Sequence, residues 1–82
     1  MADKSLPTVS SAELVRALRR AGFKARAKQT RGSHQSFVRV NDDGSKDIVV
    51  VKMGAKEIPK GTLKSILRQA HITPDQLRKF LR

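Results

Sequence analysis

Among the residues that could carry chemistry, one histidine stands out because the chain offers few alternatives. His34 ends the run Arg31-Gly32-Ser33-His34, and the sequence has no cysteine, tyrosine or tryptophan and only one other histidine, His71. A histidine side chain exchanges a proton near neutral pH, as phosphodiester cleavage requires. We weigh two interpretations of His34: a catalyst acting on RNA, and an incidental strand residue in a basic binding module.

The charge of the chain points to a polyanionic partner. Eighteen Lys and Arg against seven Asp and Glu give a formal net charge of +11, which attracts nucleic acid. Metal-independent RNA cleavage uses the 2′-hydroxyl as its nucleophile. It needs a base, an acid (a lysine, a water molecule or the same histidine) and cations beside the phosphorane. Lys28, Arg31 and Lys52 can supply charge, while Ser33 can donate a hydrogen bond to a phosphate and Gly32 permits its close approach.

A second group of cations recurs at i, i+4 and i+8 along an expected helix: Lys60, Lys64 and Arg68. Such a stripe is either a solvated helix face or a row of phosphate contacts, and the sequence favours neither interpretation over the other. Phe37 is the only aromatic side chain available for base stacking on the expected sheet, so we expect binding to be mainly electrostatic.

The composition disfavours other classes of site. Without cysteine the chain forms neither a disulfide nor a thiolate metal site, which suits a cytoplasmic protein. Asp42 and Asp43 are better explained as turn formers than as a carboxylate pair, and two histidines far apart in sequence do not indicate a metal site. We expect no metal and no cofactor. The longest apolar run, Ile48 to Val51, is too short to cross a membrane.

Local signals predict the elements that position these residues. Residues 1–9 are expected to form a mobile tail and residues 10–82 a single domain. Ser10 and Glu13 have the spacing of a capping box that starts the first helix, and Gly22 supplies its left-handed stop.

Strands follow the first helix. From Phe23 the apolar period changes to two until Gly32 breaks the pattern, which predicts a strand with one cationic face. The facing of the next strand, about 33–40, stays open: Phe37 belongs in a core by size, whereas Val38 and Val40 argue for the opposite face. A bulge could reconcile them.

The rest of the chain completes a two-layer fold. Residues 41–44 predict a hairpin turn, and residues 46–52 a third strand that we expect to be the most buried. Pro59 fits the first position of a second long helix, and Thr73 caps a short last helix. His71, at a helix end, caps carbonyl groups or lies in solvent. The order α-β-β-β-α-α predicts an α+β sandwich with a three-stranded antiparallel sheet, similar to the double-stranded-RNA-binding domain.

Three segments carry a family resemblance: Gly32-Ser33-His34, then Asp43-Gly44, and then residues 57–70, which contain I-P-K-G-T-L-K-S-I-L. Together, over about Ser10 to Leu81, they resemble the HicA family of type II toxins. The resemblance implies a small basic mRNA interferase whose histidine after the glycine, His34 here, is catalytic. It also implies a HicB antitoxin that covers the active site, with promoter DNA bound only indirectly, through the antitoxin.

The sequence departs from the common family pattern at three places. Gln35 stands where a second histidine is often found, Lys52-Met53-Gly54 replaces a frequent stretch containing Pro and His, and His71 replaces a usual helix-ending glycine. We predict a cytoplasmic, metal-independent endoribonuclease of single-stranded mRNA that uses one histidine, His34, in general acid/base catalysis, with the acid partner left open as above. The alternative is a non-catalytic basic RNA-binding module of the same fold.

Overall fold

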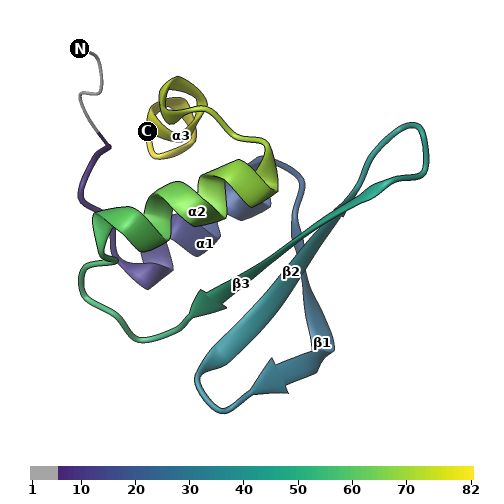
Figure 1. The fold of residues 1–82 in the computed structure, drawn as a ribbon, viewed down its shortest axis with the longest axis horizontal. Coiled ribbons are helices and arrows are strands. Elements are labelled where there is room, and N and C mark those ends of the chain that lie inside the picture. Colours follow the sequence, from purple (N-terminus) through teal and green to yellow (C-terminus); the bar gives the residue numbers. More distant parts are fainter. Residues whose placement is uncertain (1–5) are drawn as a thin grey trace.

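The computed structural model describes residues 6–82, apart from the side chains of residues 27–31. It confirms the predicted α+β class and the element order (Figure 1). The elements are α1 (Ser11–Arg20), β1 (Lys24–Arg31), β2 (His34–Val40), β3 (Lys46–Lys52), α2 (Lys60–Ala70) and α3 (Pro74–Phe80).

The three strands form one antiparallel sheet in the order β1-β2-β3, so β2 is central. The register between β2 and β3 is unbroken from the pair His34–Lys52 to the pair Val40–Lys46. The irregularity in the sheet lies instead between β1 and β2, where the register shifts between Ala25 and Thr30. The bulge considered for residues 33–40 therefore belongs to the pairing with β1.

The unbroken β2–β3 register settles which way β2 faces. Phe37 is 1% exposed and pairs with Val49, which is fully buried, so both point toward the helices. Alternate residues point the other way, toward an open face. β3 has three buried residues and β2 has two, which agrees with the prediction that β3 is the most buried strand, but Ile48 and Val50 are 43% and 49% exposed on that open face. An antiparallel sheet covered on one side only buries every second residue.

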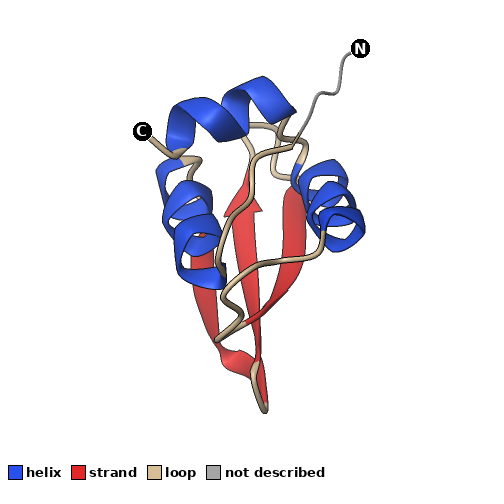
Figure 2. Cartoon of the chain, turned by 90° about the vertical axis from the view of Figure 1, so that its left-hand side faces the viewer, coloured by secondary structure: helices blue, strands red, loops and turns tan. Residues whose placement is uncertain are grey.

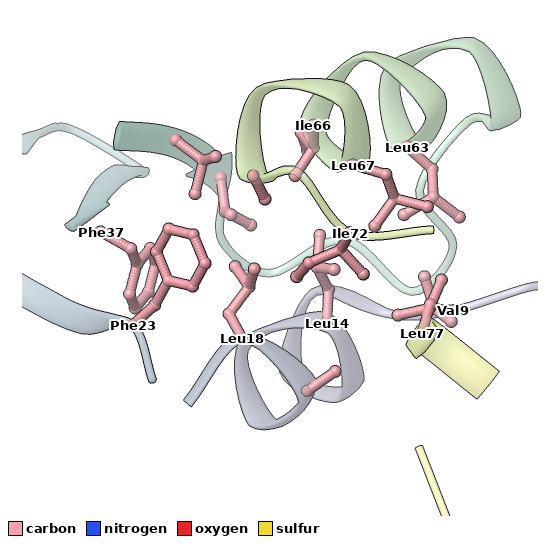
Figure 3. Close-up of a cluster of buried hydrophobic side chains, with 14 of the residues drawn as sticks. Val9, Leu14, Leu18, Phe23, Phe37, Leu63, Ile66, Leu67, Ile72 and Leu77 are labelled. Atoms are coloured by element: carbon pink, nitrogen blue, oxygen red, sulfur yellow. The ribbon is translucent and has the colours of Figure 1, made fainter. Parts of the chain in front are cut away.

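One apolar core lies between the sheet and the helices (Figure 3). It includes Leu14 and Leu18 from α1 and Leu63 and Leu67 from α2, and all four are less than 5% exposed. The predicted tail reached too far, because Val9 is 1% exposed and its carbonyl accepts a hydrogen bond from the Ile58 N–H at 2.8 Å. Burial of the apolar side chain of Val9 holds this residue in place although it precedes the first helix.

The helix ends follow most of the predicted signals. Ser10 and Thr73 both form complete capping boxes, with Glu13 and Gln76 at the third helical positions. Pro59, however, is the N-cap of α2 rather than its first helical residue, and it provides no side-chain cap. The short α3 lies across the helical layer on the side away from the β1–β2 turn (Figure 2).

A polar network fastens both long helices to the sheet. The guanidinium of Arg39 on β2 donates hydrogen bonds to the carbonyl of Ala70 at 2.8 Å, to that of Ala21 at 3.2 Å and to the carboxylate of Asp47 at 2.9 Å. His71 Nδ1 lies 3.0 Å from the other oxygen of Asp47. The ends of α1 and α2 are thus held at one end of the β2–β3 hairpin.

His71 itself ends α2 in the left-handed conformation, with φ of 57°. Its side chain is 73% exposed, in agreement with the predicted solvent-exposed position, and its ring also contacts Asp47. Its backbone N–H does close the helix end, bonding to the carbonyl of Arg68.

Candidate functional site

A two-residue turn places His34 at the start of β2. Arg31 pairs with His34, which leaves only Gly32 and Ser33 to reverse the chain. Gly32 has φ of 58° and Ser33 has a negative φ, as a type II′ hairpin turn requires. The carbonyl of Ser33 accepts a hydrogen bond from the N–H of Met53 at 2.7 Å. The turn is therefore joined to the segment that leaves β3.

His34 points to the open face of the sheet, directly across from Lys52. Both side chains are exposed. Opposed residues of an antiparallel pair have Cβ atoms about 4.5–5.5 Å apart, so the imidazole and the ammonium group can reach the same phosphate. Among the side chains that the structure describes, none forms a hydrogen bond with the imidazole of His34.

A buried serine fixes the position of Lys52. Ser11, in the first turn of α1, is 2% exposed, and its hydroxyl donates to the carbonyl of Lys52 at 2.6 Å. The hydroxyl oxygen of Ser11 also accepts a hydrogen bond from the N–H of Ala55 at 3.0 Å. The backbone N–H of Ser11 also bonds to the carbonyl of Ala55, at 2.9 Å. The end of β3 opposite His34 is thereby bound to the helical layer.

The open face carries positive charge and no acidic residue on its strands. Alternation places Lys46 and Lys52 on this face at the two ends of β3, while Asp47 points to the helices. The hydrogen bond from Arg39 holds the pKa of Asp47 below its usual value, against the opposing effect of burial, so this carboxyl is an anion engaged on the other side. The potential around His34 therefore favours anions.

The predicted site residues separate into two groups. Gly32, Ser33 and Lys52 do lie beside His34. Lys28 and Arg31 belong to β1, but their side chains lie outside the described part of the structure.

The helical cations are elsewhere. Lys60, Lys64 and Arg68 lie along one side of α2, where they line a groove together with α3 and the N-terminal segment. In Figures 1 and 2 the β1–β2 turn and α3 are at opposite ends of the molecule, with α2 between them.

We name this concavity the α2 groove. Its volume is about 710 Å³ and its lining is mostly apolar. Besides the three cations, it is lined by Leu6, Gly61, Leu67, Ile72 and Pro74.

Two further predictions concern neighbours of His34. Phe37 cannot act as a stacking platform, because it is buried under the helices. Gln35, which takes the place of a frequent second histidine, follows His34 directly and therefore faces the opposite side of the sheet. Its side-chain amide donates to the carbonyl of Arg26 at 3.0 Å. A histidine at position 35 would thus point toward the helices, on the opposite face of the sheet from His34.

Sequence reasoning missed Ser11 and the backbone of Met53, both of which hold the surroundings of His34 in place. Neither has a local signal, since their partners are about twenty to forty residues away in the chain. Over residues 6–82 the structure has no helix long and apolar enough to span a membrane. Within the same described range, no cluster of three or more acidic or histidine side chains could hold a metal ion.

The chain was compared with known proteins and protein families. Among curated proteins, none matches the chain significantly. A family model described as the HicA toxin of bacterial toxin–antitoxin systems matches residues 11–72. This match covers about three quarters of the chain and includes the whole sheet, the Gly32 turn, His34 and Lys52, whereas Leu6 and α3 lie outside it. From the first turn of α1 to the end of α2, the chain belongs to the HicA family of toxins of bacterial toxin–antitoxin systems.

Proposed function

We propose that the chain is the toxin of a type II pair and cuts single-stranded mRNA in the cytoplasm as a metal-independent endoribonuclease. His34 acts as its general acid and base. The observation that carries this proposal is the exposed imidazole on an acid-free cationic face, opposite Lys52 and beside a glycine turn. Membership of a toxin family supports a damaging activity over passive binding.

The proposed reaction begins with a ribose 2′-hydroxyl. The imidazole of His34 takes its proton, the oxygen attacks the adjacent phosphorus, and the bond to the 5′-oxygen breaks to leave a 2′,3′-cyclic phosphate. The 5′-oxygen receives a proton from water or from the imidazolium. The ammonium group of Lys52 offsets the charge on the phosphorane, and Ser33 donates to a phosphate oxygen.

Other cations are proposed to bind RNA because of their charge. Lys28 and Arg31 belong to β1, the strand that leads into the Gly32 turn, and we propose that both bind phosphate groups. Lys60, Lys64 and Arg68 line the α2 groove on another side of the molecule. A phosphate-binding role for these three remains a prediction.

A HicB-type antitoxin neutralises the toxin by covering the open face. The family membership implies an antitoxin partner. Val40, Ile48 and Val50 are 62%, 43% and 49% exposed there, which gives a protein partner an apolar surface beside His34. Promoter DNA is bound through the antitoxin.

Cleavage of an unstructured RNA in the presence of EDTA tests the proposal. The unmodified chain should cut and leave cyclic phosphate and 5′-hydroxyl ends, and His34→Ala should lower the rate by about 100-fold or more. His71→Ala removes the other histidine and is the matched control, with its rate close to that of the unmodified chain. RNA with a 2′-deoxyribose at the cleaved position should stay intact.

The alternative, a non-catalytic RNA-binding module, predicts a different set of results. In that case the antitoxin-free chain binds RNA in a salt-sensitive way but does not cut it. Cleavage that survives His34→Ala unchanged would contradict the assignment of His34.

A further inference from the structure

The α2 groove is a second candidate interaction surface, distinct from the surroundings of His34. Lys60, Lys64 and Arg68 follow each other at one-turn intervals along its rim, over about 12 Å of helix. Its lining includes no acidic residue, and α2 has neither an acid in its first turn nor a side-chain N-cap. The rim therefore attracts a partner with negative charges at a similar spacing.

The floor of the groove distinguishes among anionic partners. Leu6, Leu67, Ile72 and Pro74 provide aliphatic surface and no aromatic ring. Single-stranded nucleic acid gains its affinity in such grooves from stacking on aromatic side chains as well as from phosphate contacts. Aliphatic surface between cations instead matches the apolar and acidic faces of a protein segment, which places side chains in a groove at helical spacing.

Two residues that line the α2 groove lie outside the range of the family match. Leu6 and Pro74 both lie outside residues 11–72, the part of the chain that the family model matches. The match therefore does not fix these two lining residues in other family members. A surface that can differ among related chains is suited to recognising one partner among related ones.

We propose that the α2 groove binds an acidic amphipathic segment of the antitoxin and selects the cognate antitoxin over related ones. This inference rests on the partnership with an antitoxin and not on the ribonuclease chemistry of His34. The antitoxin then contacts the toxin at two places, its open sheet face and its α2 groove. Two linked contacts raise the overall affinity beyond that of either one.

The test is the dissociation constant of the toxin–antitoxin complex at low ionic strength, measured by calorimetry in the His34→Ala background. Lys64→Glu reverses the central rim charge. Because the new Glu lies four residues from Lys60 and from Arg68, it supports the helix. We expect it to raise Kd by about tenfold or more, with a smaller effect at high salt. Lys79→Glu, an equal change on exposed α3, is the matched control and should leave Kd nearly unchanged.

A second pair of variants tests the apolar floor. Leu6→Asp should weaken the complex to a similar degree, while Leu6→Met, which conserves volume, should not. Circular dichroism of the free variants checks that both remain folded. A related but non-cognate antitoxin should gain relative affinity when the groove is altered.

Three results would overturn the proposal. Equal Kd values for Lys64→Glu and Lys79→Glu would show that the antitoxin does not use the groove. A selective loss of RNA affinity in Lys64→Glu would assign the groove to nucleic acid. Dissociation of a dimer of the free toxin by the same change would assign it to a second copy of the chain. A failure of RNA cleavage by the unmodified chain would leave all three comparisons intact.

Discussion

Arg39 and Asp47 lie opposite each other on β2 and β3, and the guanidinium Nη2 donates to the carboxylate Oδ2 at 2.9 Å. The side chain of Asp47 is 9% exposed, and Asn41 and His71 also contact it. Arg39 in turn holds the carbonyl groups at the ends of both long helices. Removing Asp47 therefore leaves a partly buried cation with less compensation.

We expect Asp47→Asn to lower the free energy of unfolding by about 1.5–3 kcal/mol, since hydrogen bonds to charged groups contribute that much. Denaturant unfolding at neutral pH measures it. Asp42→Asn makes the same change of charge in the exposed turn and should cost less than about 0.5 kcal/mol. An equal loss in both variants would mean that the network contributes little.

The same variant should alter the response to acid. Arg39, by its hydrogen bond, lowers the pKa of Asp47 in the folded state, so its stabilisation is complete above the unfolded-state pKa. It is lost as pH falls from about 5 through the folded-state pKa. Asp47→Asn should therefore lose less stability over this range than the unmodified chain. The stability of this variant should still decrease somewhat as pH falls, because hydrogen bonds from Ser45 also lower the pKa of Asp43.

His71 offers a test of backbone strain. Its φ of 57° is costly for any residue with a Cβ atom, by roughly 1 kcal/mol or more. His71→Gly and His71→Ala both remove the contact with Asp47, so the difference between them isolates the backbone. We expect the glycine variant to be more stable than the alanine variant by about 1 kcal/mol in thermal or denaturant unfolding. No difference would mean that the helix end relaxes.

Ser11 should matter for stability and for cleavage together. Ser11→Ala leaves the carbonyl of Lys52 and the N–H of Ala55 without this partner, which costs about 1–3 kcal/mol. Ser65→Ala, on partly exposed α2, is the control and should be nearly neutral. If Ser11 positions Lys52, the folded variant also cuts RNA more slowly under conditions where it is fully native.

The two lysines at the ends of β3 form a matched pair. Lys52 lies opposite His34, whereas Lys46 lies opposite Val40 at the far end of the same face. Lys52→Gln should slow single-turnover cleavage by about tenfold or more, and Lys46→Gln should not. The slope of log affinity against log salt should fall by about 0.7–1 for each lost phosphate contact. Equal rates for the two variants would contradict the role of Lys52.

The sequence predicted those parts of the fold that depend on near neighbours. The capping boxes at Ser10 and Thr73, the left-handed Gly22 and the turn at residues 41–44 all involve partners within a few positions. The element order followed from them. His34 could likewise be chosen as a candidate, because so few residues in the chain can exchange a proton near neutral pH.

The remaining features depend on contacts between distant segments. The facing of β2 could not be decided because Phe37, Val38 and Val40 give opposite signals, and only the pairing with β3 resolves them. The exposure of Ile48 and Val50 could not be predicted, since a run of four apolar residues does not reveal that one face of the sheet stays open. Arg39 and Asp47 are charged residues, for which exposure is the usual expectation.

The open face of β3 has a further consequence for the free chain. β3 is an edge strand, and Ile48 and Val50 alternate along it as exposed β-branched residues, which is the arrangement that promotes stacking of sheets from different molecules. Lys46 and Lys52 flank the two residues as gatekeepers against aggregation. We expect these two positive charges to oppose association between free molecules most strongly at low ionic strength, where they are least screened, so added salt should promote self-association.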